Sequence, residues 1–369
     1  MLELRERDFK SFFVAPEHAY GKDSPFVSIF DADLKRLLDA TQNPLLKHFG
    51  ALTFFTAVRD GVPVGRITAH VHTLSNRRHG WNRSSFGYFD CADDAEAATL
   101  LLGAAERWGR DRGHDEIWGN FNLTAMAPAG VVTDGFENPP YSDQLWNPPH
   151  TPKLLEANGY TREFPMAQFE VEPAKFDPEA VLKPEHRALR TDPSLHWGHV
   201  RVKGLDRLIP EICDAFNDGF ANNPMFVPLT HEEFHFAAKD LSWVIDPKIS
   251  SIVREKGEVV GILLCIPDLN PLLRQCRSRF GLTTLPRLLL YRRRRRRAVV
   301  IIQGVRQRLQ NRGIGAVMIH EVLTALRAAG YEKLGITWIA DENIPSLRGA
   351  MKGGARQIHR LHLFKKPLR

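Results

Sequence analysis

Residues 298–323 read AVVIIQGVRQRLQNRGIGAVMIHEVL and contain the three patterns that decide the fold. The β-branched run from Ala298 to Val305 predicts a strand, and the apolar spacing from Val317 onward predicts a helix. Between them a short basic loop ends in Gly313-Ile314-Gly315, where bare backbone amides at a helix start can approach an anion. The order of strand, basic loop and helix therefore predicts a pyrophosphate site, although a pair of glycines can also serve close packing alone.

Positive charge is concentrated in and before this motif. Arg306, Arg308 and Arg312 add full charges to the positive end of the predicted helix. The chain carries 50 basic and 43 acidic residues, a net charge of +7, yet the segment 269–297 alone holds ten arginines and no acid. The basicity is therefore local, and it points to a phosphate-rich ligand, an anionic membrane or a nucleic acid.

A second copy of the same pattern lies nearer the N-terminus. The stretch FFTAVRDGVPVGRITAHV resembles SSIVREKGEVVGILLCIP at an offset of 196 residues, and KLLEANGY resembles AMKGGA at an offset of 195. Each copy begins with a hairpin signal, at Asp60-Gly61 and Lys256-Gly257, and continues as alternating strands and helices. This order predicts an α/β fold, a mixed sheet covered by helices, that is duplicated in tandem.

The spacing of the two copies predicts the domain boundaries. With 369 residues, the chain is long enough for two domains. We expect an N-terminal domain at 1–172, a linker rich in proline and charge at 173–195, and a C-terminal domain at 196–369 with the basic insertion 269–297.

Composition excludes several classes of protein. Apolar residues make up 43% of the chain and charged residues 25%, which is typical of a soluble globular protein. The four cysteines are scattered, so neither a disulfide framework nor a cysteine zinc site is expected. No apolar run reaches ~18 residues, and the charged start MLELRERDFK lacks an apolar signal core. We expect a cytoplasmic protein, with peripheral attachment at the inner face of the cell membrane as an option.

The loop resembles a known family. The motif Q-x-x-G-x-G at 310–315 resembles the acyl-CoA signature of the GNAT acyltransferases, and Asn343 with Ser346 resembles the start of that family's next helix. The resemblance covers 200–369 and, more weakly, 50–165. Phrases such as FVPLTHEEF and NPPHTPKLLEANGY look like a bacterial subfamily of double-domain GNAT proteins. Some of that subfamily are proposed ceramide-forming N-acyltransferases.

The resemblance implies acyl-CoA as co-substrate and no metal. In the family, the loop amides hold the pyrophosphate, and a splayed strand holds the pantetheine through its backbone. The residues that it assigns to the cofactor are Gly304, Val305, Gln310, Asn311, Arg312, Gly313, Ile314, Gly315, Ala316 and Asn343.

Three features depart from the family pattern. Ala350 stands where a tyrosine often protonates the leaving thiolate, and Gln307 replaces the usual proline of the loop. In the first copy the corresponding helix opens with CADDAE at 91–96, whose carboxylates would repel a pyrophosphate. We therefore expect the first copy to be degenerate, without a CoA site. It carries a Pro-rich insertion at 131–152. The segments NFNLTAMAPAGVVTDGF (120–136) and NPP (138–140 and 147–149) are candidate loops of the acceptor groove, or ordinary Pro-rich packing.

An amine acceptor must lose a proton before it attacks a thioester, so a carboxylate or histidine is needed nearby. The candidates are Asp268 after the second hairpin, Asp341 after the strand that contains Trp338, and His235. Each has a simpler interpretation: Asp268 could start a turn, Asp341 could cap a helix, and His235 could be a surface residue. Backbone amides near Gly304 and Val305 would polarise the thioester carbonyl.

The segment HEEFH at 231–235 matches the zinc-peptidase motif H-E-x-x-H. A peptidase also needs a third protein ligand, and none is placed recognisably downstream. The alternatives are residues of the acceptor site and a plain exposed helix, so a zinc hydrolase is not expected.

The arginine-rich insertion mixes cations with leucines, which suits an anionic lipid surface through Arg292–Arg297. A contact to CoA phosphate, a solvated loop and a nucleic acid are the alternatives, but only Phe280 and Tyr291 could stack on bases. The sequence thus predicts an acyl-CoA N-acyltransferase, at best one that joins a long acyl chain to a sphingoid-type amine. An N-acetyltransferase of a small soluble amine and a non-catalytic acyl-CoA or lipid-binding protein remain alternatives.

Overall fold

The computed structural model describes residues 1–47, 51–124, 127–223, 225–238 and 241–368. The N-terminal half starts with an edge strand and helices, continues with a hairpin, and then alternates strands and helices. Its elements are β1 (Leu2–Glu6), α1 (Phe9–Tyr20), α2 (Asp31–Leu38), η1 (Pro44–Lys47), β2 (Ala51–Arg59), β3 (Val62–Val71), α3 (Thr73–His79), β4 (Arg83–Cys91), α4 (Ala95–Arg110), β5 (Glu116–Gly119), β6 (Val131–Asp134), α5 (His150–Ala157) and β7 (Thr161–Val171).

The C-terminal half follows a similar order, with two helices, α10 and α11, between the hairpin and the next strand where the N-terminal half has α3. Its elements are η2 (Pro173–Lys175), η3 (Pro178–Val181), α6 (Pro184–Ala188), β8 (Leu195–Gly198), α7 (Leu205–Phe220), α8 (His231–Ala238), α9 (Leu241–Val244), η4 (Pro247–Ile249), β9 (Ser250–Glu255), β10 (Glu258–Pro267), α10 (Asn270–Gln275), α11 (Thr284–Arg294), β11 (Arg297–Val305), η5 (Gln307–Leu309), α12 (Ile314–Ala328), β12 (Lys333–Ala340), α13 (Ile344–Lys352) and β13 (Arg356–Pro367).

Both predicted hairpins are confirmed. β2 pairs with β3, and β9 pairs with β10, each in antiparallel register. At the tips, Asp60 and Gly61 have φ angles of 48° and 80°, and Lys256 and Gly257 have φ angles of 52° and 83°. Two successive positive φ angles are the turn geometry that matches the right-handed twist of a hairpin.

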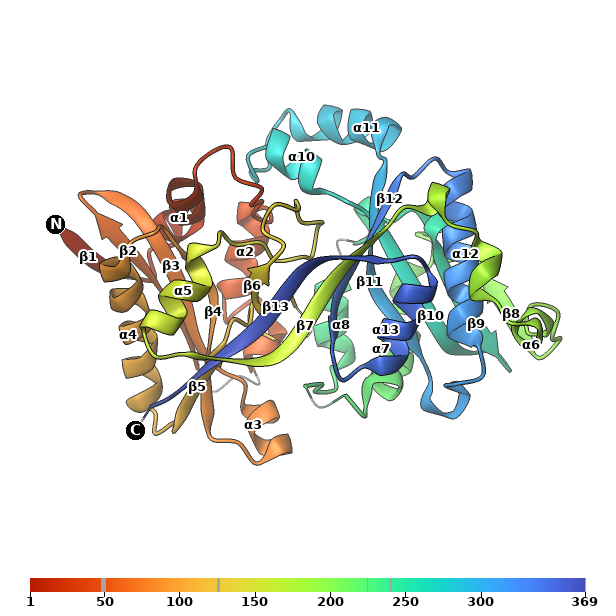
Figure 1. Cartoon of the computed structure of the whole chain (residues 1–369), viewed down its shortest axis with the longest axis horizontal. Helices are drawn as coiled ribbons and strands as arrows, with labels where there is room; N and C mark the ends of the chain where they lie inside the picture. The colour runs from red at the N-terminus through yellow and green to blue at the C-terminus, as the bar shows by residue number, and fades with distance from the viewer. Residues whose placement is uncertain (48–50, 125–126, 224, 239–240, 369) are drawn as a thin grey trace.

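The two halves exchange their last strands. β7, which ends the N-terminal half, pairs antiparallel with β12 of the C-terminal half, and β13 pairs antiparallel with β5 of the N-terminal half. β7 and β13 also pair with each other at the centre of the molecule (Figure 1). Among the described residues, one sheet therefore runs through both halves in the order β1-β2-β3-β4-β5-β13-β7-β12-β11-β10-β9-β8, with β6 on β13. The predicted mixed α/β sheet is confirmed.

One long helix covers each half of the sheet. α4 buries Leu101 and Leu102 against β3 and β4 in the N-terminal core, and α12 buries Met318 and Leu323 against β10 and β11 in the C-terminal core. A third apolar cluster joins the halves through residues of β7, β12 and β13, among them Met166. The core is therefore continuous across the junction.

The segment predicted as a linker is folded against α12. Glu179 of η3 accepts a hydrogen bond from His320 at 2.6 Å, and Arg327 donates to the carbonyl of Phe176 at 3.1 Å. The proposed boundaries at 172 and 195 thus enclose a segment that packs on the C-terminal half. No helix within the described residues is long and apolar enough to cross a membrane.

Candidate active site

β11 and β12 run in parallel for a short distance and then diverge. Their register joins Arg297 to Lys333 and ends where Val300 pairs with Ile336, although both strands continue. On its other side β11 remains paired with β10 as far as Val305. Apart from the Val305 carbonyl, which accepts from the Gln310 side chain, the backbone of 301–305 therefore has an unpaired side toward β12, to which an extended ligand can hydrogen-bond.

The helix that follows β11 starts without a cap. Gly313 precedes it with a φ of 90°, and no side chain among the described residues accepts a hydrogen bond from the first backbone amides of α12, at 314–316. An ideal Cβ placed on Gly315 would lie 3.8 Å from its nearest neighbour, the side-chain nitrogen of Gln303, so this glycine is not closely covered. Uncapped amides at the positive end of a helix are suited to a phosphate.

Gln310 braces the loop between β11 and α12. Its side-chain amide donates hydrogen bonds to the carbonyls of Gly219 and Val305, at 3.0 and 2.9 Å. Gly304 lies against the ring of Phe220, 3.3 Å from an ideal Cβ. The C-terminus of α7 therefore holds the end of β11 in place.

The prediction that Arg306, Arg308 and Arg312 add three free charges to the loop is wrong for the first two. Arg306 forms an ion pair with Glu258 at 3.0 Å, and Arg308 forms ion pairs with Glu255 and Glu258. Acids that the hairpin β9–β10 supplies thus neutralise both arginines. Arg312 is exposed and has no ion-pair partner among the described residues, so the loop offers one free cation beside the uncapped amides.

Two further residues assigned by the resemblance have local roles. Asn343 caps α13, where its side chain accepts a hydrogen bond from the amide of Ser346 at 3.2 Å. Ala350 is the buried residue of the same helix and supplies no hydroxyl group. The contact of Asn343 with a cofactor, like that of Asn311 and the other loop residues, stays a prediction.

The equivalent region of the N-terminal half is closed. β4 and β5 are parallel only from Arg83–Glu116 to Ser85–Trp118, but two amides of β4 beyond this point are occupied by side chains. Tyr88 N donates to the side chain of Asn122 at 2.9 Å, and Phe89 N donates to that of Asn120 at 3.2 Å.

The start of α4 is closed as well. Asp94 caps the helix by accepting from the amide of Ala97 at 3.0 Å, and Arg59 pairs with Asp94 and Glu96. At both places where a cofactor could bind in this half, side chains of the chain itself thus engage backbone amides, which supports the predicted degeneracy of the first copy.

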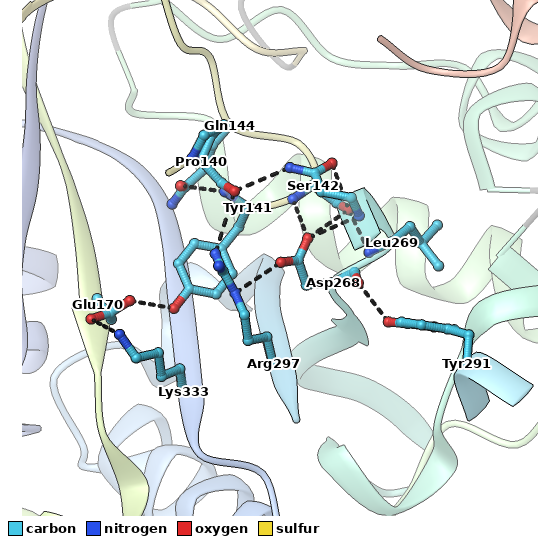
Figure 2. Close-up of polar contacts among 11 residues, drawn as sticks. Pro140, Tyr141, Ser142, Gln144, Glu170, Asp268, Leu269, Tyr291, Arg297 and Lys333 are labelled. Carbon is cyan, nitrogen blue, oxygen red and sulfur yellow. Dashed lines mark hydrogen bonds and ion pairs between the residues drawn. The ribbon is translucent and has the colours of Figure 1, made fainter. Parts of the chain in front are cut away.

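Asp268, a candidate base, is engaged in a buried network between the halves (Figure 2). Its side chain is 1% exposed and forms an ion pair with Arg297 at 3.0 Å. It also accepts hydrogen bonds from the amide and the hydroxyl of Ser142, at 2.9 and 3.1 Å. These contacts make Asp268 a connector between the basic insertion and the N-terminal half, and its role as a base stays a prediction.

The other two candidates lie at different places. Asp341 follows β12 at the end remote from Arg297, and its two oxygens contact the guanidinium of Arg360. His235 is exposed on α8, 3.6 Å from Asp206. The structure does not bring the three candidate bases together, and each already has a charged partner within the chain.

The HEEFH segment forms α8, and its two histidines face different acids of α7. His231 lies 2.7 Å from Asp214, while His235 lies near Asp206. In the described part of the chain, no group of three or more His, Cys, Asp or Glu side chains is arranged to hold a metal ion.

We expect purified protein to contain no stoichiometric zinc. The replacement His231→Ala removes an exposed side chain, so it should change the free energy of unfolding by less than about 0.5 kcal/mol. Metal analysis by mass spectrometry and thermal unfolding check both points. One zinc per chain that is lost in His231→Ala would instead support a hydrolase.

The sequence comparisons agree with this geometry. The profile of the Acetyltransferase (GNAT) family matches residues 209–350, from within α7 to within α13. The "Bacterial ceramide synthase" of Caulobacter vibrioides is 24% identical over 369 residues, which cover 98% of this chain and 95% of the relative. "Protein YghO" of Escherichia coli is 25% identical, over 99% of this chain and 94% of its own.

Solved structures share the duplicated fold. A tandem GNAT protein from the clavulanic acid biosynthesis pathway has a TM-score of 0.59 at 11% identity, over 100% of this chain and 99% of its own. A GCN5-related N-acetyltransferase from Sphaerobacter thermophilus has a TM-score of 0.56 at 16% identity, over 100% and 96%. The predicted tandem duplication of this acyltransferase fold is thereby confirmed.

Proposed function

We propose, from the premise that this chain is a tandem-domain acyltransferase of the GNAT family, that it transfers a long acyl chain from acyl-CoA to a lipidic amine of the sphingoid type. The product would be a ceramide-like amide. The observation that carries the acyl-CoA part is the unpaired side of β11 in front of the uncapped start of α12. The similarity of nearly the whole chain to a ceramide synthase supports the acceptor class.

The donor would bind in the C-terminal half only. The amides at 314–316 and the guanidinium of Arg312 would hold the pyrophosphate, and the backbone of 301–305 would pair with the pantetheine. Acyl-CoA supplies the activated thioester carbon, whereas the chain orients it and excludes a second cofactor from the closed N-terminal half.

A lipidic substrate is supported by the surface of the α10–α11 insertion. Five large apolar side chains there are between 48% and 100% exposed: Phe280, Leu282, Leu285, Leu289 and Leu290. The exposed Arg292, Arg293 and Arg294 follow directly at the end of α11. Apolar side chains beside cations are suited to the headgroup region of an anionic bilayer.

The arginine run does not act as six free charges. Arg295 pairs with Asp246 at 2.5 Å, Arg296 pairs with Glu332, and Arg297 pairs with Asp268. The expectation of a uniform run from Arg292 to Arg297 is corrected accordingly. The part of the run without an acidic partner among the described residues is 292–294, in which Arg292 donates to the carbonyl of Trp243. This part would be available to a membrane, because 295–297 are ion-paired within the chain.

We expect the triple replacement of Arg292, Arg293 and Arg294 by glutamine to weaken binding to anionic vesicles. At about 1 kcal/mol per cation, the loss is about 3 kcal/mol, or roughly 100-fold in affinity at low salt. Sedimentation with vesicles that contain phosphatidylserine measures it.

The matched control replaces Arg107, Arg110 and Arg112 by glutamine, which removes the same charge at the far end of the molecule, on and after α4 (Figure 1). Equal vesicle binding by both variants would contradict a docking surface on α11. A loss of CoA affinity in the first variant would assign 292–294 to the cofactor instead.

The function is tested directly by turnover of the full chain. Release of CoA thiol and formation of amide are measured with palmitoyl-CoA or acetyl-CoA as donor, and with a long-chain amino alcohol or a small polar amine as acceptor. We expect amide only from the long-chain pair, with the long-chain acceptor presented in vesicles. Product formation confined to acetyl-CoA and the polar amine would show a soluble N-acetyltransferase.

The missing hydroxyl at Ala350 favours a second candidate, a protein that binds acyl-CoA without turnover. A thiolate with a pKa near ~8.5 can leave without a dedicated acid, so this observation does not decide against catalysis. Acyl-CoA binding without amide from any donor–acceptor pair would establish the second candidate.

A further inference from the structure

A turn from the N-terminal half covers β11 and β12 on the face opposite α12. Along β11, Val300 packs with residues of α12, whereas Val299 and Ile301 pack with Tyr141. The ring of Tyr141 also fills the space over Gly335, where an ideal Cβ would lie 2.5 Å from it. The turn therefore lies over the point where the two strands begin to diverge, on the face away from the predicted pyrophosphate site.

This turn is fastened to both strands that flank the divergence. Gln144 N donates to the carbonyl of Tyr141 at 3.0 Å and closes the turn. The Gln144 side chain donates at 2.9 Å to the carbonyl of Ile336, the last residue of β12 that pairs with β11. On the other side Ser142 is bound to Asp268, which pairs with the first residue of β11 (Figure 2).

Asp143 lies at the tip of the turn, between these two attachments. Its backbone has a φ of 64°, a left-handed conformation that aspartate and asparagine tolerate better than most residues. Its side chain is exposed and has neither a hydrogen-bond nor an ion-pair partner in the described residues. A carboxylate without a partner, held in an uncommon conformation by fixed neighbours, is a feature of functional sites.

The surroundings of Asp143 suit a proton acceptor. Although the side chain is accessible, nearby protein atoms displace part of its hydration and raise the pKa of Asp143 to about 7. Its charge also reaches β4 of the N-terminal half. Burial, followed by the charges of Asp90 and Asp143, raises the pKa of Tyr88 to about 12, against the opposing effect of Arg66.

We infer that Asp143 is the general base that takes a proton from the acceptor amine, which makes the N-terminal half a direct contributor to catalysis. The inference rests on the proposed acyl transfer. The ammonium of the acceptor gives one proton to the Asp143 carboxylate, and the neutral amine then attacks the thioester carbon. The C–N bond forms while the C–S bond breaks, and the second proton on nitrogen goes to the thiolate. The products are the amide and CoA thiol, and Asp143 returns its proton to solvent.

The test compares Asp143→Asn with the parent chain in the palmitoyl-CoA assay. A positioned base contributes about 10²–10⁴ in rate, so we expect kcat to fall at least 100-fold while the Kd of acyl-CoA stays unchanged. In the parent, kcat/KM for the amine should rise as pH increases through about 7, because the carboxylate must be ionised to accept a proton. In Asp143→Asn this rise of kcat/KM with pH should be absent. Asp143→Glu should have a kcat at least tenfold higher than that of Asp143→Asn.

Other charged groups near Asp143 do not account for such a step. Tyr88 of β4 interacts with it electrostatically, and the Arg66–Asp90 pair lies beside the Tyr88 ring. The Asp268–Arg297 pair is joined to the turn through Ser142. The Tyr88 phenol ionises far above this range. The matched control is Glu137→Gln, which removes an exposed carboxylate from the same insertion and should leave kcat and the pH profile unchanged.

The outcomes separate this inference from the proposed function. Amide formation by Asp143→Asn at the parent rate, with the same pH profile, would overturn the role of Asp143 and leave acyl transfer standing. A fall in the rate that appears equally in Glu137→Gln would assign the effect to folding of the insertion and also overturn it. Absence of amide from the parent chain itself would overturn the proposed function, and the inference with it.

Discussion

The replacement Gly315→Glu is expected to abolish CoA binding while the fold remains intact. Gly315 is in the first turn of α12, has a helical φ, and leaves 3.8 Å between an ideal Cβ and the nearest side chain. A carboxylate at this position stabilises the helix start by about 0.3–1 kcal/mol. It also places a negative charge where a diphosphate would bind, at a cost of about 3 kcal/mol for charges roughly 5 Å apart, which is more than 100-fold in affinity.

Calorimetric titration with CoA measures this effect. We expect one site per chain in the parent, because Asp94 and Glu96 already occupy the equivalent helix start of the N-terminal half. Gly315→Ala is the matched control, since it adds a Cβ without charge and should bind CoA at nearly the parent affinity. Parent-like affinity in Gly315→Glu, or two sites in the parent, would contradict the assignment of the cofactor to α12.

Gly313 is a less suitable position for this test. Its φ of 90° disfavours any side chain, and an ideal Cβ would lie only 2.3 Å from the ring of His186 in α6. A substitution there would disturb the packing of the segment 173–195 as well as the anion site. A loss of CoA binding in Gly313→Glu could therefore not be attributed to charge alone.

Removal of β13 is expected to unfold both halves of the molecule. A chain that ends at Ala355 loses a strand that pairs with β5 on one side and β7 on the other. The truncation removes five buried apolar side chains, four of them in β13: Ile358, Leu361, Leu363, Phe364 and Leu368. At about 1.5–3 kcal/mol each, their burial contributes about 10 kcal/mol, which is comparable with the whole stability of a typical protein.

Circular dichroism and calorimetry should show no cooperative transition in this truncated chain. The matched control removes residues 1–6, which include the edge strand β1; this strand has exposed side chains and pairs only with β2 among the described residues. We expect this second variant to remain folded, with a lower melting temperature. A truncated chain in which the N-terminal half still unfolds cooperatively would show that the halves are independent.

The local features of the fold were predictable because they depend on short patterns. The two hairpins follow from Asp60-Gly61 and Lys256-Gly257, whose conformations are set within a few residues. The glycine start of α12 follows from a loop whose spacing is specific. The absence of a free cofactor site in the N-terminal half was predictable only in part. The acids at 91–96 indicate it, whereas no sequence pattern indicates that Asn120 and Asn122 accept hydrogen bonds from the amides of β4.

Features that depend on pairing between distant segments could not be predicted. β7 and β13 both follow an equivalent helix in equivalent copies, so the sequence of either strand does not specify which half it completes. The acids that pair with Arg295 and Arg297 come from β-sheet neighbours and from the η4 turn. Asp143 lies in a Pro-rich loop without periodicity, and only its neighbours' contacts across the junction distinguish it from other loop acids.

The exchange of strands also limits how the molecule can move. Two-domain enzymes often open and close about a few loop residues that act as a hinge. Here the halves are joined by two long strands hydrogen-bonded to each other and to both neighbours, so rotation of one half against the other would break a ladder at the centre of the sheet. We therefore expect substrates to enter and products to leave through displacement of surface segments such as α10 and α11. The distance between the predicted acyl-CoA site, at 301–305 and the start of α12, and the turn at 141–144 should stay constant during turnover.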